Sequence, residues 1–272
     1  MSLTILCAAL VTQLSNLKLI WSEEFDKPGP PNLANWRPEI GFTRNHELQW
    51  YQLENATVSD EHLTIEARQE KRKNPNYSAE AKTDWKKNRE FIVYTSSSLV
   101  SRQMWKFGRF EMRAKIDTRA GLWPAFWTWG EARDWPSGGE IDIMEYYRGK
   151  LLANAAWGTS RQWTAKWDSS ATPIEDLVRK DGLKSAEDWA SRFHTWRMDW
   201  DEKWIRIYVD GHLLNEVELS KTINESADKA NPFHEPQRLI VNLAVGGDNG
   251  GDPAGTKFPA KYTIDWIRVY QK

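Results

Sequence analysis

Short runs in which apolar and polar residues alternate constrain the fold of this chain more than any other feature. In Trp204–Val209 every second residue is Ile or Val, the period that puts one face of a strand against a core. Asp210 and Gly211 follow, a pair typical of a tight hairpin turn. Further strand-like runs lie at Leu63–Ala67, Phe91–Tyr94, Arg109–Ile116, Glu140–Tyr147, Leu239–Val245 and Thr263–Tyr270. The pattern predicts antiparallel β-structure folded as a two-layer sandwich.

The chain has 272 residues and no internal repeat, so we expect one large domain over residues 19–272. We expect residues 1–18 to be an N-terminal extension or the remnant of a signal peptide. The apolar stretch Leu3–Val11 fits such a remnant, but it also fits an ordered first strand.

Two stretches interrupt the strand pattern, Lys71–Arg89 and Thr172–Phe193. Within the second, Ile174–Lys180 and Glu187–Ala190 have the pattern of short helices. We expect both stretches to be loops over the sheets, serving either as functional loops or as solvated insertions.

The charged residues argue against two classes of partner. The chain has 37 Lys and Arg against 38 Asp and Glu, a net charge of −1, so it carries no excess of positive charge for nucleic acid or anionic lipid. No apolar run approaches the ~20 residues of a membrane span. The single cysteine, Cys7, excludes an intramolecular disulfide and a thiolate metal cage.

Three carboxylates are concentrated in one predicted strand. Residues two apart share a face of a strand, so Glu140 and Asp142 point the same way. Strict alternation would place Met144 beside them instead of Glu145. For all three acids to converge, the strand must contain an extra residue. We therefore predict a β-bulge near Met144, a feature that is common beside active sites.

Like charges close together in a cleft raise the pKa of at least one carboxyl group. One carboxyl can then be a proton donor while another, still ionised, is a nucleophile. Cleavage of a glycosidic bond needs such a pair, about 5–5.5 Å apart in a retaining enzyme. Two other interpretations are an exposed acidic edge strand and a cation-binding strand. The apolar residues between the acids argue against the first, and cation sites usually use flexible loops and carbonyl ligands. We therefore favour catalysis.

Seventeen tryptophans are unusually many for this length. Trp123, Trp127 and Trp129 have the spacing of one strand face, and Trp135 follows just before the acidic strand. Aromatic residues lie in the hydrophobic core more often than they bind a ligand. Beside carboxylates, however, this run predicts a wall on which sugar rings stack.

These segments resemble the signature of glycoside hydrolase family 16. The acidic strand Gly139–Tyr146 and the upstream Gly121–Trp127 carry the resemblance most specifically. Further segments follow in the family's order: Trp21–Asp26, Asn45–Tyr51, Tyr94–Ser96, Phe107–Glu111, Phe193–Trp196, Asn242–Gly247 and Ile264–Tyr270.

The resemblance implies an all-β jelly-roll sandwich of two curved antiparallel sheets, with a concave groove where a polysaccharide is cleaved internally and with retention of configuration. It implies that Glu140 is the nucleophile, that Glu145 is the general acid/base, and that Asp142 hydrogen-bonds the nucleophile. The candidate substrate-binding residues are Asn45, Trp123, Trp127, Trp135, Trp157 and Asn242.

The spacing with the extra Met144 is similar to the laminarinase, agarase and carrageenase branches of the family. Laminarinase-like members commonly have a histidine after the acidic strand, whereas Leu152–Gly158 contains none. The following Arg161, Trp163 and Trp167 either form a different substrate wall or pack under the Thr172–Phe193 insertion. We favour an endo-β-1,3-glucanase. The alternatives are a galactan hydrolase of agarase, porphyranase or carrageenase type, a transglycosylase and a carbohydrate-binding homologue.

Some members of the family hold a structural calcium ion, and Glu24 and Asp265 occupy matching positions. These acids form either a calcium site or hydrogen bonds to loop amides. The reaction itself requires no cofactor. We expect a monomer whose partner is a polysaccharide and which is secreted, periplasmic or on the cell surface, because its substrate is a large polymer.

Overall fold

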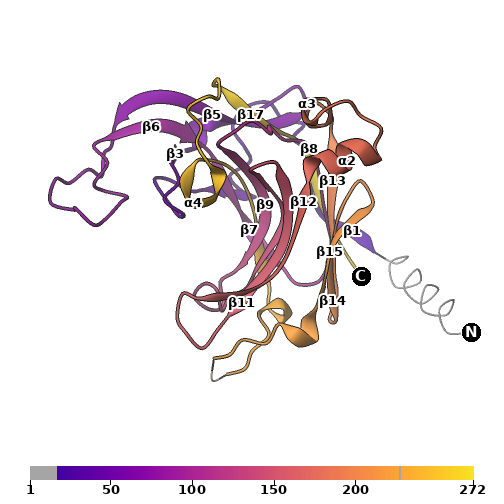
Figure 1. Ribbon diagram of the computed structural model, residues 1–272. Coiled ribbons are helices and arrows are strands. Elements are labelled where there is room, and N and C mark those ends of the chain that lie inside the picture. Colours follow the sequence, from indigo (N-terminus) through magenta and orange to yellow (C-terminus); the bar gives the residue numbers. More distant parts are fainter. Residues whose placement is uncertain (1–16, 227) are drawn as a thin grey trace, which may run out of the picture.

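The computed structural model describes residues 17–226 and 228–272 and has the predicted two-layer architecture (Figure 1). Two curved sheets pack face to face, and the predicted all-β sandwich is confirmed. Leu3–Val11 and Cys7 lie outside the described residues, while β1 begins at Lys18. Among the described residues, no helix has the length and apolar character to cross a membrane.

The larger sheet has ten strands. In spatial order they are β15 (His212–Glu218), β14 (Trp204–Val209), β13 (His194–Trp200), β8 (Gly108–Lys115), β17 (Ala260–Gln271), β5 (His62–Lys73), β6 (Phe91–Ser96) and β3 (Gln49–Tyr51), with β1 (Lys18–Glu23) beside β17 and β4 (Ala56–Ser59) beside β5. Strands β3 and β6 pair in parallel, and the other pairs in this sheet are antiparallel.

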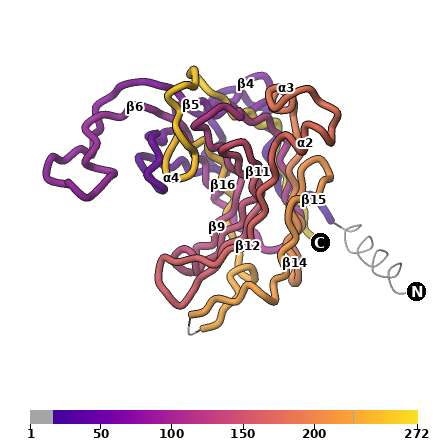
Figure 2. The backbone as a smooth tube through the Cα atoms, in the orientation of Figure 1, coloured from indigo at the N-terminus to yellow at the C-terminus, as the bar shows by residue number. Residues whose placement is uncertain are grey.

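The smaller sheet has seven antiparallel strands and carries the groove described below. Their order is β12 (Ala165–Pro173), β11 (Lys150–Gly158), β10 (Glu140–Tyr147), β9 (Leu122–Gly130), β16 (Gln237–Val245), β7 (Ser98–Trp105) and β2 (Trp36–Pro38). The backbone tube shows the curvature of β9, β11 and β12 and the long β5–β6 hairpin that projects beside them (Figure 2).

The hairpin turn at Asp210–Gly211 is confirmed. Val209 pairs with His212 across it, and both turn residues have positive φ, +48° and +81°, as a type I′ turn requires. Every strand predicted from the sequence coincides with an observed strand to within a few residues. Strands β7, β11, β12 and β13 are among those that were not predicted. β7, β11 and β12 lack a clean alternation of apolar and polar residues. In β13, however, Trp196, Met198 and Trp200 alternate with polar residues, a pattern that could have revealed the strand.

The two predicted loops differ in structure. The first prediction is wrong at its start, because β5 continues to Lys73, where it pairs with β6. In the second, the predicted helices are confirmed as α2 (Ile174–Lys180) and α3 (Ala186–Ala190). Trp189 of α3 is fully buried and stacks on His194, with ring centroids 3.6 Å apart. This insertion therefore closes one end of the core, whereas a solvated loop would leave that end open. A further short α-helix is α4 (Gly247–Gly250), and single 3-10 turns occur at Leu53–Asn55, Leu219–Lys221 and Pro232–His234.

Candidate active site

The acidic strand β10 contains the predicted bulge. Against β9, Asp142 pairs with Trp127 and Met144 with Phe126, so one extra residue lies between the two pairs. Against β11, the register likewise shifts between Asp142 and Glu145. Met144 is 1% exposed and belongs to the core between the sheets. The bulge therefore turns Glu145 to the same face as Glu140 and Asp142, which confirms the prediction.

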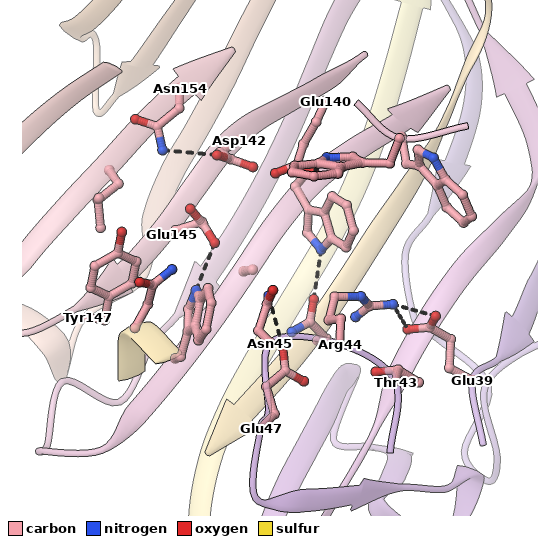
Figure 3. A pocket seen from close by; sticks show the side chains of 18 of the residues that line it. Glu39, Thr43, Arg44, Asn45, Glu47, Glu140, Asp142, Glu145, Tyr147 and Asn154 are labelled. Carbon is pink, nitrogen blue, oxygen red and sulfur yellow. Dashed lines mark hydrogen bonds and ion pairs between the residues drawn. The ribbon is translucent and has the colours of Figure 1, made fainter. Parts of the chain in front are cut away.

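All three carboxylates line one groove of about 960 Å³ on the concave face of the smaller sheet (Figure 3). The strand register fixes what lies beside them. One row across the sheet runs through Trp129, Glu140, Ala156 and Trp167, and the next runs through Trp127, Asp142, Asn154 and Ser169. The side chains of both rows face the groove because they share strand parity.

Each carboxylate accepts a hydrogen bond from a neutral donor. The indole Nε1 of Trp135 donates to Oε2 of Glu140 at 2.7 Å, and the indole Nε1 of Trp123 donates to Oε1 of Glu145 at 2.7 Å. Nδ2 of Asn154 donates to Oδ2 of Asp142 at 2.9 Å. Trp123 and Trp135 are therefore hydrogen-bond donors to the acids, a role that the predicted stacking wall did not include.

Burial raises the pKa of all three carboxyl groups, and the neighbouring acids raise it further. Desolvation and then the charge of Glu140 raise the pKa of Glu145 to about 7, against a lowering effect of the Trp123 N–H. Desolvation and the charge of Asp142 also raise the pKa of Glu140 well above its usual range. The cluster therefore holds at least one proton near neutral pH, as a proton donor to a leaving group must.

The loop before β3 forms the opposite side of the groove. Asn45 lines the groove as predicted, and Arg44 lies over the Trp127 ring with its guanidinium carbon 5.2 Å from the ring centroid. Arg44 is bonded through both oxygens of the Glu39 carboxylate. Sequence reasoning did not identify Arg44 or Glu39, because the contact of Arg44 with Trp127 depends on how this loop folds over β9.

Two further predicted substrate-binding residues line the groove and also bond to each other. Nε1 of Trp127 donates to Oδ1 of Asn242 at 2.7 Å, and Nδ2 of Asn242 donates to the hydroxyl of Tyr51 at 3.0 Å. The amide of Asn242 thus holds Trp127 in place from the neighbouring strand β16.

The prediction that Trp157 binds substrate is wrong. Its neighbours in β11, Asn154 and Ala156, pair with the acids and share their face, so Trp157 has the opposite parity. It is 8% exposed and packs in the core between the sheets. Both faces of β11 are buried, so apolar and polar residues do not alternate along it. The sequence therefore does not show which of its residues face the groove and which face the core.

The residues proposed for calcium do not form a cation site. Both carboxylate oxygens of Glu24 accept hydrogen bonds from Arg268, at 2.9 and 2.8 Å. Asp265 is bonded to Arg113. No group of three His, Cys, Asp or Glu that could hold a metal ion occurs within residues 17–226 and 228–272. The residues therefore do not fit calcium, because each carboxylate is already neutralised by an arginine.

Comparison with known proteins agrees with this geometry. The model of the glycosyl hydrolases family 16 matches residues 42–268. The chain belongs to this family. The match includes the groove sheet from β7 to β16 and the three clustered acids, so the protein is a glycoside hydrolase and a polysaccharide is its partner.

Three relatives illustrate the breadth of family 16. A beta-glucanase from Rhodothermus marinus is 33% identical over 93% of this chain and 85% of its own length. A solved structure from work on endo-acting O-glycanases, which prominent human gut microbes express to initiate mucin breakdown, superposes with a TM-score of 0.83 at 30% identity, covering 94% of this chain and 91% of that one. A LamA variant from Zobellia galactanivorans in complex with laminaritriose and laminaritetraose superposes with a TM-score of 0.73 at 27% identity, covering 93% and 99%.

Proposed function

We propose that this protein is an endo-β-1,3-glucanase that cleaves internal linkages with retention of anomeric configuration. The observation that carries the proposal is the bulge in β10, which brings Glu140, Asp142 and Glu145 to one face of a groove. The beta-glucanase relative and the relative bound to laminari-oligosaccharides, which are β-1,3-linked glucose chains, support the choice of substrate.

In the first step, a carboxylate oxygen of Glu140 bonds to the anomeric carbon while the glycosidic C–O bond breaks. The electron pair of that bond stays on the leaving oxygen, which takes the proton of Glu145. The raised pKa of Glu145 keeps this proton available at neutral pH. The Trp135 N–H bonded to Glu140 favours the ionised form of the nucleophile.

In the second step, Glu145 is a carboxylate and removes a proton from water. The water oxygen bonds to the anomeric carbon, and the bond to Glu140 breaks, which regenerates both side chains. Two displacements on opposite faces of the sugar restore the original configuration. Asp142, between the two glutamates and fixed by Asn154, is positioned to exchange hydrogen bonds with Glu140.

The test is hydrolysis of a panel of polymers, read by release of reducing ends and by product sizes. We expect cleavage of laminarin into oligosaccharides of several lengths, with β-configured products by NMR at early times. Mixed-linkage glucan, agarose, porphyran, carrageenan and mucin O-glycans complete the panel. Preferred cleavage of a galactan or of mucin O-glycans would overturn the proposed substrate. Binding without cleavage would indicate a carbohydrate-binding homologue, and lengthened products would indicate transglycosylation.

We also propose that the enzyme acts as a monomer, needs no cofactor and works outside the cytoplasm. Its reaction uses two carboxyl groups and water, and its polymeric substrate does not cross a membrane. Light scattering at assay concentration, activity after EDTA treatment and fractionation of the producing cells test these three points in turn.

A further inference from the structure

The β11–β12 hairpin presents two tryptophans to solvent. Trp163 is 60% exposed and Trp167 is 46% exposed. Trp163 has φ +61°, a conformation that costs energy for a residue with a side chain. Exposing a large indole on such a backbone gives the fold no packing energy in return, which points to a binding role for the hairpin.

A hollow of about 460 Å³ lies beside Trp163 and adjoins the catalytic groove. Trp135 lines both spaces, and its Nε1 donates to Glu140 at 2.7 Å. A ligand held over Glu140 therefore reaches the second hollow by passing the Trp135 ring.

The strand register makes Trp167 part of the same path. Glu140 pairs with Ala156, and Ala156 pairs with Trp167, on the face that lines the groove. Ala156 has only a methyl group, so it leaves the indole of Trp167 uncovered beside Glu140. Trp167 therefore lines the groove beside Glu140, Trp163 lines the second hollow, and Trp135 lies on the wall that the two spaces share.

The lining of the hollow suits an uncharged sugar. Trp163 and Trp135 offer apolar faces for the C–H side of a pyranose ring. Ser137 and Gln162 offer polar groups for its hydroxyls. Arg133 and Asp228 form an ion pair at 2.8 Å, and the Asp134 carboxylate gives the lining a net charge of −1, which disfavours an anionic sugar. Aromatic faces with a few polar groups are typical of small-molecule sites.

We propose that this hollow, with Trp163 and Trp167, is a distal sugar-binding subsite that holds the polysaccharide chain beyond the unit attacked by Glu140. The proposal rests on the proposed hydrolase function and adds a location and residues to it. It gives a binding role to a hairpin whose two tryptophans are exposed and do not pack in the core.

The test compares Trp163→Ala with the wild type on laminari-oligosaccharides of increasing length. We expect kcat/KM to fall about fivefold to tenfold on the longest substrates, the loss of one aromatic contact, and to stay unchanged on the shortest cleaved substrate. Trp163→Phe should restore most of the loss. Leu213→Ala is the matched control, since Leu213 is 53% exposed on the other sheet. It should behave like wild type at every length.

A length-independent loss, or no loss at any length, would overturn the subsite while leaving the hydrolase assignment intact. If the wild type does not cleave laminari-oligosaccharides, the proposed substrate fails, and the subsite is then tested by retardation in gels containing each polymer of the panel. Weaker retardation of Trp163→Ala than of Leu213→Ala supports the subsite. Equal retardation of the two variants, or no retardation of the wild type by any polymer, overturns it.

Discussion

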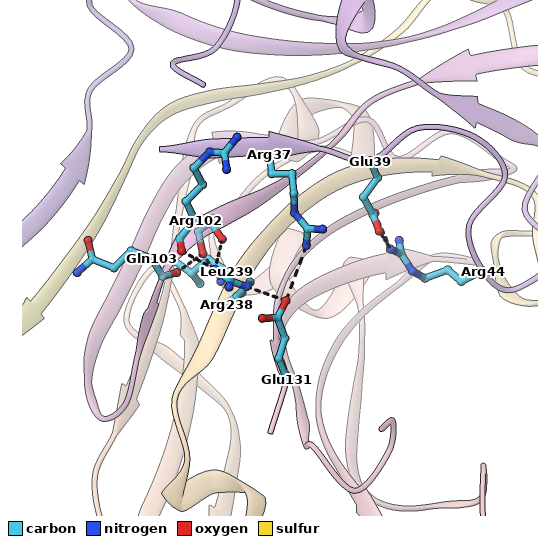
Figure 4. A network of polar contacts seen from close by, with 9 residues as sticks. Arg37, Glu39, Arg44, Arg102, Gln103, Glu131, Arg238 and Leu239 are labelled. Atoms are coloured by element: carbon cyan, nitrogen blue, oxygen red, sulfur yellow. Dashed lines mark hydrogen bonds and ion pairs between the residues drawn. The ribbon is translucent and has the colours of Figure 1, made fainter. Parts of the chain in front are cut away.

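Carboxylates in two regions of the smaller sheet have opposite surroundings. Glu131, just after β9, is bonded to Arg238 at 2.7 Å and lies 3.8 Å from Arg37 (Figure 4). The Arg238 guanidinium beside it lowers its pKa. In the groove, Glu140 and Glu145 accept hydrogen bonds from indoles, and no salt bridge to either is found in the described part of the chain. Burial and then the charge of a neighbouring acid raise the pKa of both groups.

The two kinds of surroundings distinguish acids that stabilise the fold from acids that can transfer a proton. An acid bonded to an arginine stays ionised and cannot deliver a proton near neutral pH. An acid that is buried beside other acids and contacts only neutral donors holds a proton at a free-energy cost to the folded state. Proton transfer in this protein therefore depends on the absence of a cationic partner at Glu145.

The largest effect should come from the nucleophile. Glu140→Gln removes the ionised oxygen that attacks the anomeric carbon, so we expect kcat on laminarin to fall by roughly 10⁴-fold. The amide can still accept the Trp135 N–H, so thermal unfolding should remain cooperative and no less stable. Near wild-type turnover by a folded variant would disprove the assignment of Glu140.

This contrast between acids was only partly predictable from the sequence. The spacing of Glu140, Asp142 and Glu145 required a bulge, because strand parity leaves no other way to bring three such acids together. The indole donors could not be predicted in this way. The Trp123 and Trp135 contacts depend on how β9 and the loop before β10 pack over the acids, and sequence parity says nothing about a hydrogen bond.

Where both faces of a strand are buried, the sequence also loses its information on orientation. Strand β11 reads Ala, Asn, Ala, Ala, Trp over residues 153–157, and all five are buried. Only its pairing with β10 shows that Asn154 and Ala156 face the groove and that Trp157 faces the core. Pairing between strands is a long-range property that local patterns do not encode.

The second-largest effect concerns the proton donor. Glu145→Ala should lower kcat on laminarin by about 10²–10⁴-fold, the usual contribution of general acid catalysis. With an activated leaving group, the first step no longer needs the proton, and added azide should restore turnover by attacking the glycosyl-enzyme. The product should be a β-glycosyl azide by NMR. An α-configured azide would contradict the double displacement.

Replacing the acid by its amide should stabilise the fold at Glu145 and destabilise it at Glu131. The pKa of Glu145 is raised from 4.5 to about 7, so its stability contribution is fully present below pH 4.5 and is lost as pH rises to about 7. That shift corresponds to roughly 3 kcal/mol. Glu145→Gln should therefore unfold at higher temperature than wild type at pH 8, with little difference at pH 4.

Glu131→Gln is the matched control for that measurement. The pKa of Glu131 is lowered, so its ion pair stabilises the fold above its unfolded pKa and loses that effect as pH falls through its folded pKa. The substitution should cost up to about 1 kcal/mol at neutral pH and less in acid. Stabilisation by both substitutions at pH 8, or by neither, would contradict the contrast between the two regions.

The smallest expected effect isolates a single hydrogen bond. Loss of Glu145 protonation should make kcat/KM fall above about pH 7. The Trp123 N–H lowers the pKa of Glu145 by stabilising the carboxylate, so Trp123→Phe should raise that pKa and move the alkaline limb up by about one pH unit, the value of a hydrogen bond to a charged group. Trp127→Phe removes an indole that donates to Asn242, and its limb should stay in place. Equal shifts in the two variants would mean that ring packing, rather than the N–H bond to Glu145, controls the proton.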